Sequence, residues 1–231
     1  MTSTIEPNVH GPTRTHANGD VHGWSPTPVL STAAASEIHI ADPGPLGLAA
    51  FAGTTFALSL FNAGLVGQAA LVAVVLPIAL LYGGLAQLLA GMWEFRKDNT
   101  FGAVAFTSYG AFWISYFVYA RYIAGGLPPA DAHTATGIFL LTWTIFTAYM
   151  TLAAVKTNAV LLAVFGTVLV TFALLTFGEF MESPSVLHVG GYVGLVAAAL
   201  AWYGSAAGVV NLTWGRTVLP VFPAGDGGTR R

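Results

Sequence analysis

The segment that decides the fold is residues 159–177, AVLLAVFGTVLVTFALLTF, which lies between Lys156 and Glu179 and contains no charged side chain. A helix needs about 20 predominantly apolar residues to cross the hydrocarbon core of a bilayer. This segment has that length and that character. We therefore predict that it forms a transmembrane helix.

The same pattern continues on both sides of this segment. Uncharged stretches also separate Asp42 from Glu94, Asp98 from Arg121, Asp131 from Lys156, and Glu182 from Arg216. The first of these is long enough for two helices, and its turn-like residues NAGLVGQ at 62–68 indicate a hinge. We predict an all-α integral membrane protein whose six transmembrane helices span residues 45–63, 69–94, 102–123, 134–155, 159–177 and 186–212.

The composition agrees with lipid as the main solvent and excludes several classes of function. The chain is 55% hydrophobic and 8% charged, whereas about a quarter of the residues in an average soluble domain are charged. Its net charge of -2 offers no basic surface for nucleic acid, and without cysteine it has no thiolate metal site. No acid–base pair, metal cluster or activated nucleophile lies at mid-span, so we expect neither an enzyme nor a bound cofactor.

The basic residues predict the orientation, because Lys and Arg in short loops are retained on the cytoplasmic side of a membrane. If both termini are cytoplasmic, only Arg121 lies outside. The remaining basic residues are then all inside: Arg14, Arg96, Lys97, Lys156, Arg216, Arg230 and Arg231. We expect a multi-pass plasma membrane protein of bacterial type with both termini in the cytoplasm.

The two ends of the chain are predicted to be tails. Residues 1–41 are rich in Ser, Thr, Pro and Ala and show no apolar periodicity, which is typical of a disordered segment. His10, His16 and His22 recur in it, and we interpret them as isolated imidazoles rather than a metal site or pH sensor, because chelation would order a flexible chain. Residues 42–220 form the transmembrane domain, and 221–231 form a short C-terminal tail.

Neutral polar residues recur at helical spacing inside the predicted spans. Phe51, Thr55, Ser59 and Asn62 are separated by four, four and three positions, which places them on one face of the first helix. Such a face can line a pore, but small and hydroxylated residues also let membrane helices pack closely. Glu94 has two interpretations as well, a proton relay or a carboxylate paired with Arg96 or Lys97.

The segment DPGPLGL at 42–48 resembles the NPAPLGL signature of the acetate uptake transporter family, also called acetate/succinate permeases. The motifs YGGLAQ at 82–87, NTFG at 99–102, AFTSYG at 105–110 and GRTVLP at 215–220 follow in the order and spacing of that family. The resemblance therefore covers residues 42 to 220. The signature residues are Asp42, Pro43, Gly44, Pro45, Leu46, Gly47 and Leu48.

This resemblance implies a homo-hexamer in which each six-helix protomer has its own pore. It implies passage of acetate, and in some members succinate, either through a channel or by symport with protons. The family narrows its pore with Phe, Tyr and Leu, which by motif position correspond here to Phe51, Tyr109 and Val168, with Leu169 as the neighbouring candidate. The remaining candidates for the substrate pathway are Thr55, Ser59, Asn62, Tyr82, Gln87, Glu94 and Ser108.

Two departures from the family pattern lead to specific expectations. Asp42 replaces Asn and can still cap a helix N-terminus, but an ionised carboxylate at a pore entrance would repel an anion. Val168 in place of Leu would widen the pore by one methylene and favour a slightly larger acid such as propionate or lactate. The alternatives left open are conduction of another small solute, such as ammonia or water, and a membrane sensor or scaffold that binds partners through its tail.

Overall fold

The structure, a computed structural model, describes residues 40–224. The predicted N-terminal tail, with His10, His16 and His22, therefore lies outside the described residues except for its last two positions. Of the predicted C-terminal tail, residues 221–224 are described.

The described residues form helices joined by short loops. The α-helices are α1 (Gly44–Asn62), α2 (Val75–Ile78), α3 (Gln87–Arg96), α4 (Thr100–Val118), α5 (Pro129–Ala154), α6 (Ala159–Phe180) and α7 (Pro184–Trp214). The stretches long and apolar enough to span a membrane number 6: Gly44–Asn62, Ala70–Arg96, Thr100–Gly126, Asp131–Ala154, Ala159–Phe180 and Pro184–Trp214. The predicted all-α, six-span fold is thus confirmed, with every end within about three residues of its expected position.

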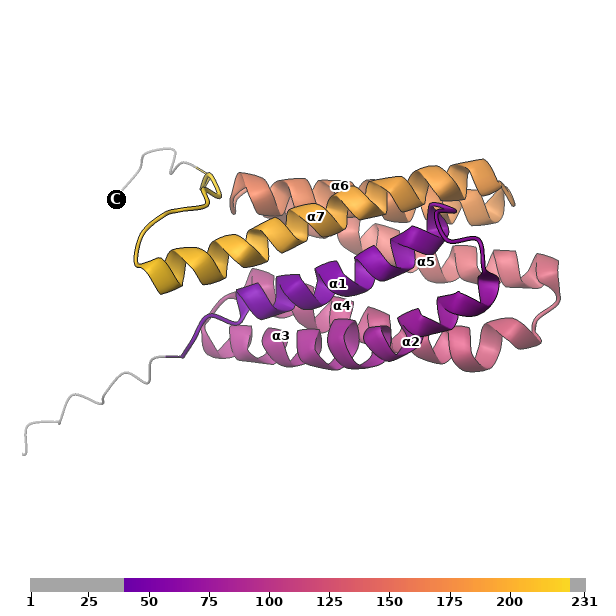
Figure 1. Ribbon diagram of the computed structural model, residues 1–231, viewed down its shortest axis with the longest axis horizontal. Coiled ribbons are helices and arrows are strands. Elements are labelled where there is room, and N and C mark those ends of the chain that lie inside the picture. Colours follow the sequence, from indigo (N-terminus) through magenta and orange to yellow (C-terminus); the bar gives the residue numbers. More distant parts are fainter. Residues whose placement is uncertain (1–39, 225–231) are drawn as a thin grey trace, which may run out of the picture. The chain divides into compact units, whose positions relative to one another are not determined.

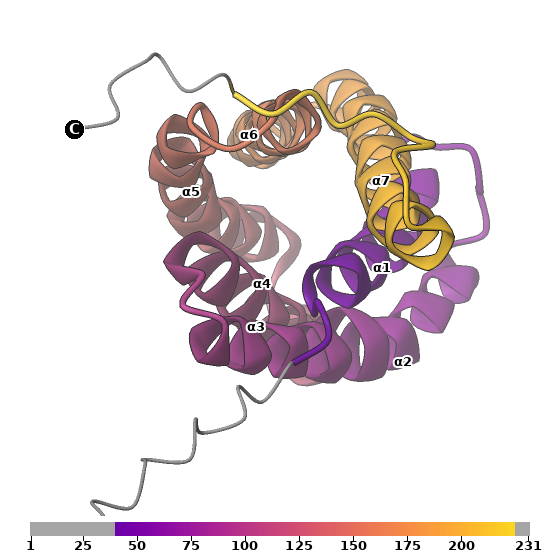
Figure 2. The same ribbon diagram turned by 90° about the vertical axis from the view of Figure 1, so that its left-hand side faces the viewer.

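The six spans are arranged in a ring when viewed along their length (Figure 2). Around the ring, α1 is followed by α7, α6, α5 and α4, and the span that ends in α3 closes the circle between α4 and α1. The helices run lengthwise, so that α3, α5 and α7 all finish at one end of the bundle (Figure 1), and Lys97 follows α3 there. We call this the Lys97 end and the opposite one, where α6 finishes, the Glu179 end.

The second span is not the single α-helix that the sequence predicts. It consists of a 3₁₀ segment η1 (Ala69–Val74), the short α2, a π-helical segment η2 (Ala79–Ala86) and α3. Pro77 has no backbone N–H to donate, and the wider π turn begins two residues after it. Within that turn Gly83 allows close packing, because a Cβ there would lie 2.5 Å from Thr54 Oγ1 and 2.8 Å from Trp113 Cδ1.

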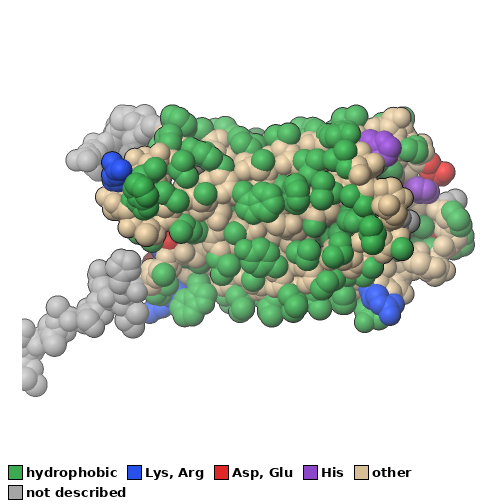
Figure 3. Space-filling view, in the orientation of Figure 1, with side chains coloured by type: hydrophobic (Ala, Val, Ile, Leu, Met, Phe, Trp, Pro, Cys, Tyr) green, Lys and Arg blue, Asp and Glu red, His purple; other side chains and the backbone are tan. Residues whose placement is uncertain are grey.

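The outer face of the bundle is apolar. Large side chains point outward along the spans, including Leu152 at 75% and Leu212 at 71% exposure. Figure 3 shows hydrophobic side chains covering the middle of one face, with charged side chains gathered at the two ends. A surface of this kind is stable against lipid tails and not against water.

The chain after α7 folds back over the Lys97 end. Gly215, with φ 63°, ends α7 in the left-handed conformation that glycine adopts without strain. Asn211 Oδ1 then accepts hydrogen bonds from the backbone N–H groups of Val218 at 2.7 Å and Leu219 at 2.9 Å. Further on, Phe222 O accepts from Ala159 N at 3.0 Å. The described part of the predicted C-terminal tail is therefore tied to the start of α6.

Candidate functional site: a narrowed path through the bundle

Two large cavities open inside the ring, one toward each end. The cavity at the Glu179 end has a volume of about 350 Å³. The cavity at the Lys97 end has a volume of about 310 Å³. A third cavity of about 20 Å³ lies between them, lined by Phe51, Tyr109 and Val168 together with Gln87.

The three cavities share lining residues, so they form one path along the bundle. Phe51 and Val168 line both the small cavity and the Glu179-end cavity. Leu48 and Phe165 line both the small cavity and the Lys97-end cavity. The narrowest part of the path therefore lies at the level of Phe51, Tyr109 and Val168.

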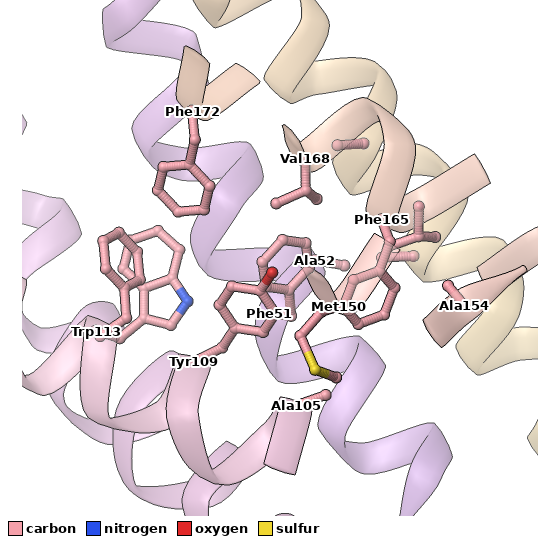
Figure 4. Packing of buried hydrophobic residues seen from close by; sticks show 14 of the residues in the cluster. Phe51, Ala52, Ala105, Tyr109, Trp113, Met150, Ala154, Phe165, Val168 and Phe172 are labelled. Atoms are coloured by element: carbon pink, nitrogen blue, oxygen red, sulfur yellow. The ribbon is translucent and has the colours of Figure 1, made fainter. Parts of the chain in front are cut away.

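The narrow part is built from aromatic rings in tilted and T-shaped contact. The ring centroids of Phe51 and Tyr109 are 5.6 Å apart, and Tyr109 meets Phe146 in a T-shaped contact at 5.3 Å. Figure 4 shows Tyr109 extending from α4 toward Phe51 of α1 and Val168 of α6. All three side chains are at most 5% exposed, so an ion that passes between them loses most of its water.

The side chains of Phe51, Tyr109 and Val168 form an apolar collar around the path, and polar groups flank this collar on both sides. Thr55, Ser59 and Asn62 line the Glu179-end cavity, as their spacing on one helix face suggested. Gln87, at the start of α3 in the second span, lines the small cavity and is 1% exposed. Among residues 40–224, Thr55 Oγ1 and Gln87 Oε1 are buried without a hydrogen-bond partner. Each of the two residues thus contributes an unpartnered polar atom close to the path.

Glu94 lines the cavity at the Lys97 end and is 2% exposed. Its Oε2 accepts a hydrogen bond of 2.8 Å from Asn99 Nδ2. Lys97 lies 3.1 Å from Asp42 instead, and Asp42 Oδ1 also accepts from Gly44 N at 3.2 Å. The carboxylate expected to cap the first helix is thus bound both to that helix and to a cation.

Other predicted candidates lie away from the three cavities. Tyr82 is 38% exposed on the outer face, with its ring beside Gly53. Ser108 and Leu169 are half-buried and line none of the cavities found within residues 40–224. Of the two positions considered for the third constriction residue, Val168 is therefore the one that faces the path.

The signature segment has residues with different roles in this geometry. Asp42, Gly44, Pro45 and Leu48 line the Lys97-end cavity. Pro43 is buried, and Leu46 is 46% exposed on the outer face. Gly47 allows contact with α4, since a Cβ there would lie 2.6 Å from the Phe106 ring.

Several lining residues were not singled out as pathway candidates from the sequence. They line the Glu179-end cavity and comprise Tyr119, Thr136, Phe139, Thr171, Phe172, Leu175, Glu179 and His188. Phe112, Trp113 and Tyr116 of the third predicted span also line this cavity, and their three- and four-residue spacing after Tyr109 indicates one helix face. Those on α5 and α6 carried no comparable signal, since their neighbours in the structure are distant in the sequence.

Comparison with known proteins agrees with this geometry. Residues 25–224 match the model of the GPR1/FUN34/yaaH family. The chain is 40% identical over 182 residues to the succinate-acetate/proton symporter SatP of Escherichia coli strain K12, a match covering 79% of this chain and 95% of that protein. It is 38% identical over 210 residues to acetate permease A of Emericella nidulans, covering 83% and 70% of the two chains.

Two further comparisons bear on the substrate. The chain is 39% identical over 194 residues to ammonia transport outward protein 2 of Saccharomyces cerevisiae, covering 82% of this chain and 66% of that protein. A solved structure, that of the bacterial acetate channel SatP, superposes with a TM-score of 0.73 at 38% identity, covering 79% of this chain and 99% of that one.

Proposed function

Because this chain belongs to the GPR1/FUN34/yaaH family, we propose that it is a multi-pass membrane transport protein that passes acetate and related short carboxylates through the path inside each protomer. Relatives named for acetate or succinate transport, and a solved acetate channel of the same fold, support this proposal. Their names describe transport proteins, which argues against a role as an enzyme.

The observation that carries the proposal is the lengthwise path with an apolar collar at Phe51, Tyr109 and Val168. Acetate has one methyl group and one carboxylate, so a pore must accept the methyl and replace part of the water lost by the oxygens. The collar accepts the methyl group, and neutral groups such as Thr55 and Gln87 flank it. Weak, repeated binding of this kind favours conduction, whereas a fixed cation at mid-span would retain the anion.

The test is uptake of labelled acetate by liposomes that contain the purified protein. We expect saturable uptake above that of empty liposomes, with succinate competing at higher concentration because it carries a second carboxylate. Phe51→Trp, which fills the collar, should abolish most of the flux. Uptake equal to that of empty liposomes would reject the proposal.

Ammonia is the second candidate substrate, because one similar protein is named for outward ammonia transport. A collar lined by neutral groups does not by itself distinguish ammonia from acetate. The two are separated by competition, because excess ammonium should leave labelled acetate uptake unchanged if acetate is the substrate. A strong reduction of labelled acetate uptake by ammonium at constant pH would favour ammonia as the substrate.

We further propose that the Lys97 end faces the cytoplasm. Among residues 40–224, Arg96, Lys97, Lys156 and Arg216 belong to loops or helix ends at that end, and Arg121 belongs to the other. Cysteine is absent from the chain, so single cysteines introduced at Lys156 and at Leu127 can report the orientation. In intact cells an impermeant thiol reagent should label the cysteine at 127 and leave the one at 156 unlabelled.

The assembly proposed here is a homo-hexamer in the lipid bilayer, with one path in each subunit. The support is the family likeness together with the apolar outer face, which suits both lipid and neighbouring protomers. Light scattering of the detergent-solubilised protein should give a protein mass six times the 24.0 kDa of one chain. A mass of one chain would contradict the hexamer and leave the path within each protomer unaffected.

A further inference from the structure

The hydroxyl group of Tyr109 has one hydrogen-bond partner among the described residues. Tyr109 Oη lies 2.8 Å from Thr147 Oγ1, and this contact is buried. Thr147 lies on α5 and is 0% exposed. The Tyr109 ring contacts several other rings, including those of Phe51, Phe146 and Phe165. The hydroxyl at the collar therefore depends on a single threonine of another helix.

Other threonines of α5 use their protons within their own helix. Thr136, Thr144 and Thr151 each donate to the carbonyl four residues earlier. Thr136 also contacts a tyrosine, since its Oγ1 lies 2.8 Å from Tyr119 Oη. Because the Thr136 proton goes to the Ala132 carbonyl, Tyr119 is the donor in that pair, and its own proton is occupied.

The pair at the collar differs in this respect. Within residues 40–224 the Thr147 hydroxyl bonds to Tyr109 and to no backbone carbonyl. Its proton is free to go to Tyr109 Oη, which has lone pairs to accept it. In that arrangement the Tyr109 proton is not used by the protein. The Tyr109 ring lines the small cavity, whose walls expose only apolar atoms in this structure, so a solute reaches the hydroxyl group by opening the collar.

We infer that Thr147 is a positioning residue of the pore, which donates to Tyr109 Oη and so leaves the Tyr109 proton free for the transported carboxylate. The inference rests on the proposed function. When a carboxylate enters the small cavity, it accepts the Tyr109 proton while Tyr109 accepts that of Thr147. The two bonds polarise each other in the same direction, which strengthens both. When the cavity is empty, one of the two protons has no acceptor whichever hydroxyl donates, and a carboxylate oxygen supplies the missing acceptor.

The test is a double-mutant cycle on acetate flux in liposomes. Thr147→Val keeps the shape of the side chain and removes the hydroxyl, and we expect acetate flux to fall about five- to tenfold, the effect of one hydrogen bond. Thr147→Ser keeps the hydroxyl and should retain flux within about twofold. In the Tyr109→Phe background, Thr147→Val should cause no further loss, because the acceptor of its proton is already gone.

Thr144→Val is the matched control. Thr144 lies on the same helix and makes a similar contact between hydroxyl groups, 3.0 Å from Thr176 of α6, but neither residue lines a cavity within residues 40–224. This variant should keep the wild-type flux. If Thr147→Val does not assemble on size exclusion, Thr147→Ala replaces it in the same cycle.

The outcomes separate this inference from the proposed function. A wild-type protein that passes no acetate overturns both. A wild-type protein that passes acetate overturns this inference alone if Thr147→Val has normal flux, if Thr147→Ser is as impaired as the valine variant, or if the loss is equally large in the Tyr109→Phe background.

Discussion

Lys97 Nζ lies 3.1 Å from Asp42 Oδ1 at the rim of the cavity near α3. Asp42 stands where the family signature has Asn, and an unpaired carboxylate at that place would repel an incoming anion. The pairing with Lys97 offsets this charge. The substitution in the signature is therefore matched by a cation from a loop 55 positions away in the chain.

Separating this pair should change acetate flux in opposite directions. Asp42→Asn leaves Lys97 unpaired at the rim, where it attracts anions, so we expect flux to rise by about twofold at low ionic strength. Lys97→Met leaves Asp42 unpaired and should lower flux by a similar factor. Both side chains are partly exposed, so the effects should shrink as salt increases toward 0.15 M or so.

Lys156→Met is the control for this experiment, because Lys156 is an exposed cation near the same end that lines none of the cavities within residues 40–224. The explanation fails if both variants at the rim change flux in the same direction. It also fails if their effects do not depend on salt.

Val168→Leu should make the path more selective for acetate. Val168 lines the small cavity and the Glu179-end cavity, so one added methylene narrows the path at the collar. One methylene in an apolar pocket changes discrimination by about tenfold or more. We expect the ratio of acetate to lactate flux to rise by about that factor in liposomes.

Val170→Leu serves as the matched control, since Val170 lies on the same helix and is 48% exposed on the outer face. It should leave the acetate-to-lactate ratio as in the wild type. An unchanged ratio in Val168→Leu would show that this side chain does not set the width of the path.

Glu94→Gln tests whether a proton accompanies the carboxylate through the protein. Glu94 is a buried carboxyl group in the wall of the Lys97-end cavity, and an amide in its place can keep the hydrogen bond with Asn99 after a flip but cannot exchange a proton. In this variant we expect acetate uptake to persist in the absence of a pH gradient. The increase in acetate uptake that a pH gradient causes in the wild type should be largely lost.

Asp98→Asn controls for the loss of a negative charge near the same end. Asp98 is exposed, and its φ of 56° suits Asn as well as Asp. It should respond to the pH gradient as the wild type does. Full retention of the gradient response in Glu94→Gln would exclude this carboxyl as the proton carrier and leave acetic acid itself as the route.

Gly83→Ala should destabilise the protomer. A Cβ at Gly83 would lie 2.5 Å from Thr54 Oγ1, so the π-helical segment would have to move away from α1 and α4, at a cost of about 1–3 kcal/mol. Within one protomer a Cβ at Gly166 meets nothing within 4 Å, so Gly166→Ala is the comparison. A thermal unfolding midpoint in detergent that is lower only for Gly83→Ala would agree with this packing.

The amino-acid sequence by itself determined the number of spans and their approximate limits, because uncharged apolar stretches of about 20 residues have one stable environment, the bilayer. It also placed Thr55, Ser59 and Asn62 on one face, since those positions belong to a single helix and follow its period. Residues within one element can be related in this way without knowledge of their neighbours.

Only the tertiary structure decided which residues meet across helices. The contact of Tyr109 with Thr147, the pairing of Asp42 with Lys97 and the position of Val168 on the path each join segments distant in the chain. Their meeting depends on how the spans rotate and pack around the central space. Periodicity within a span does not determine that rotation, because in lipid both faces of a helix are apolar and the burial of hydrophobic surface does not select one.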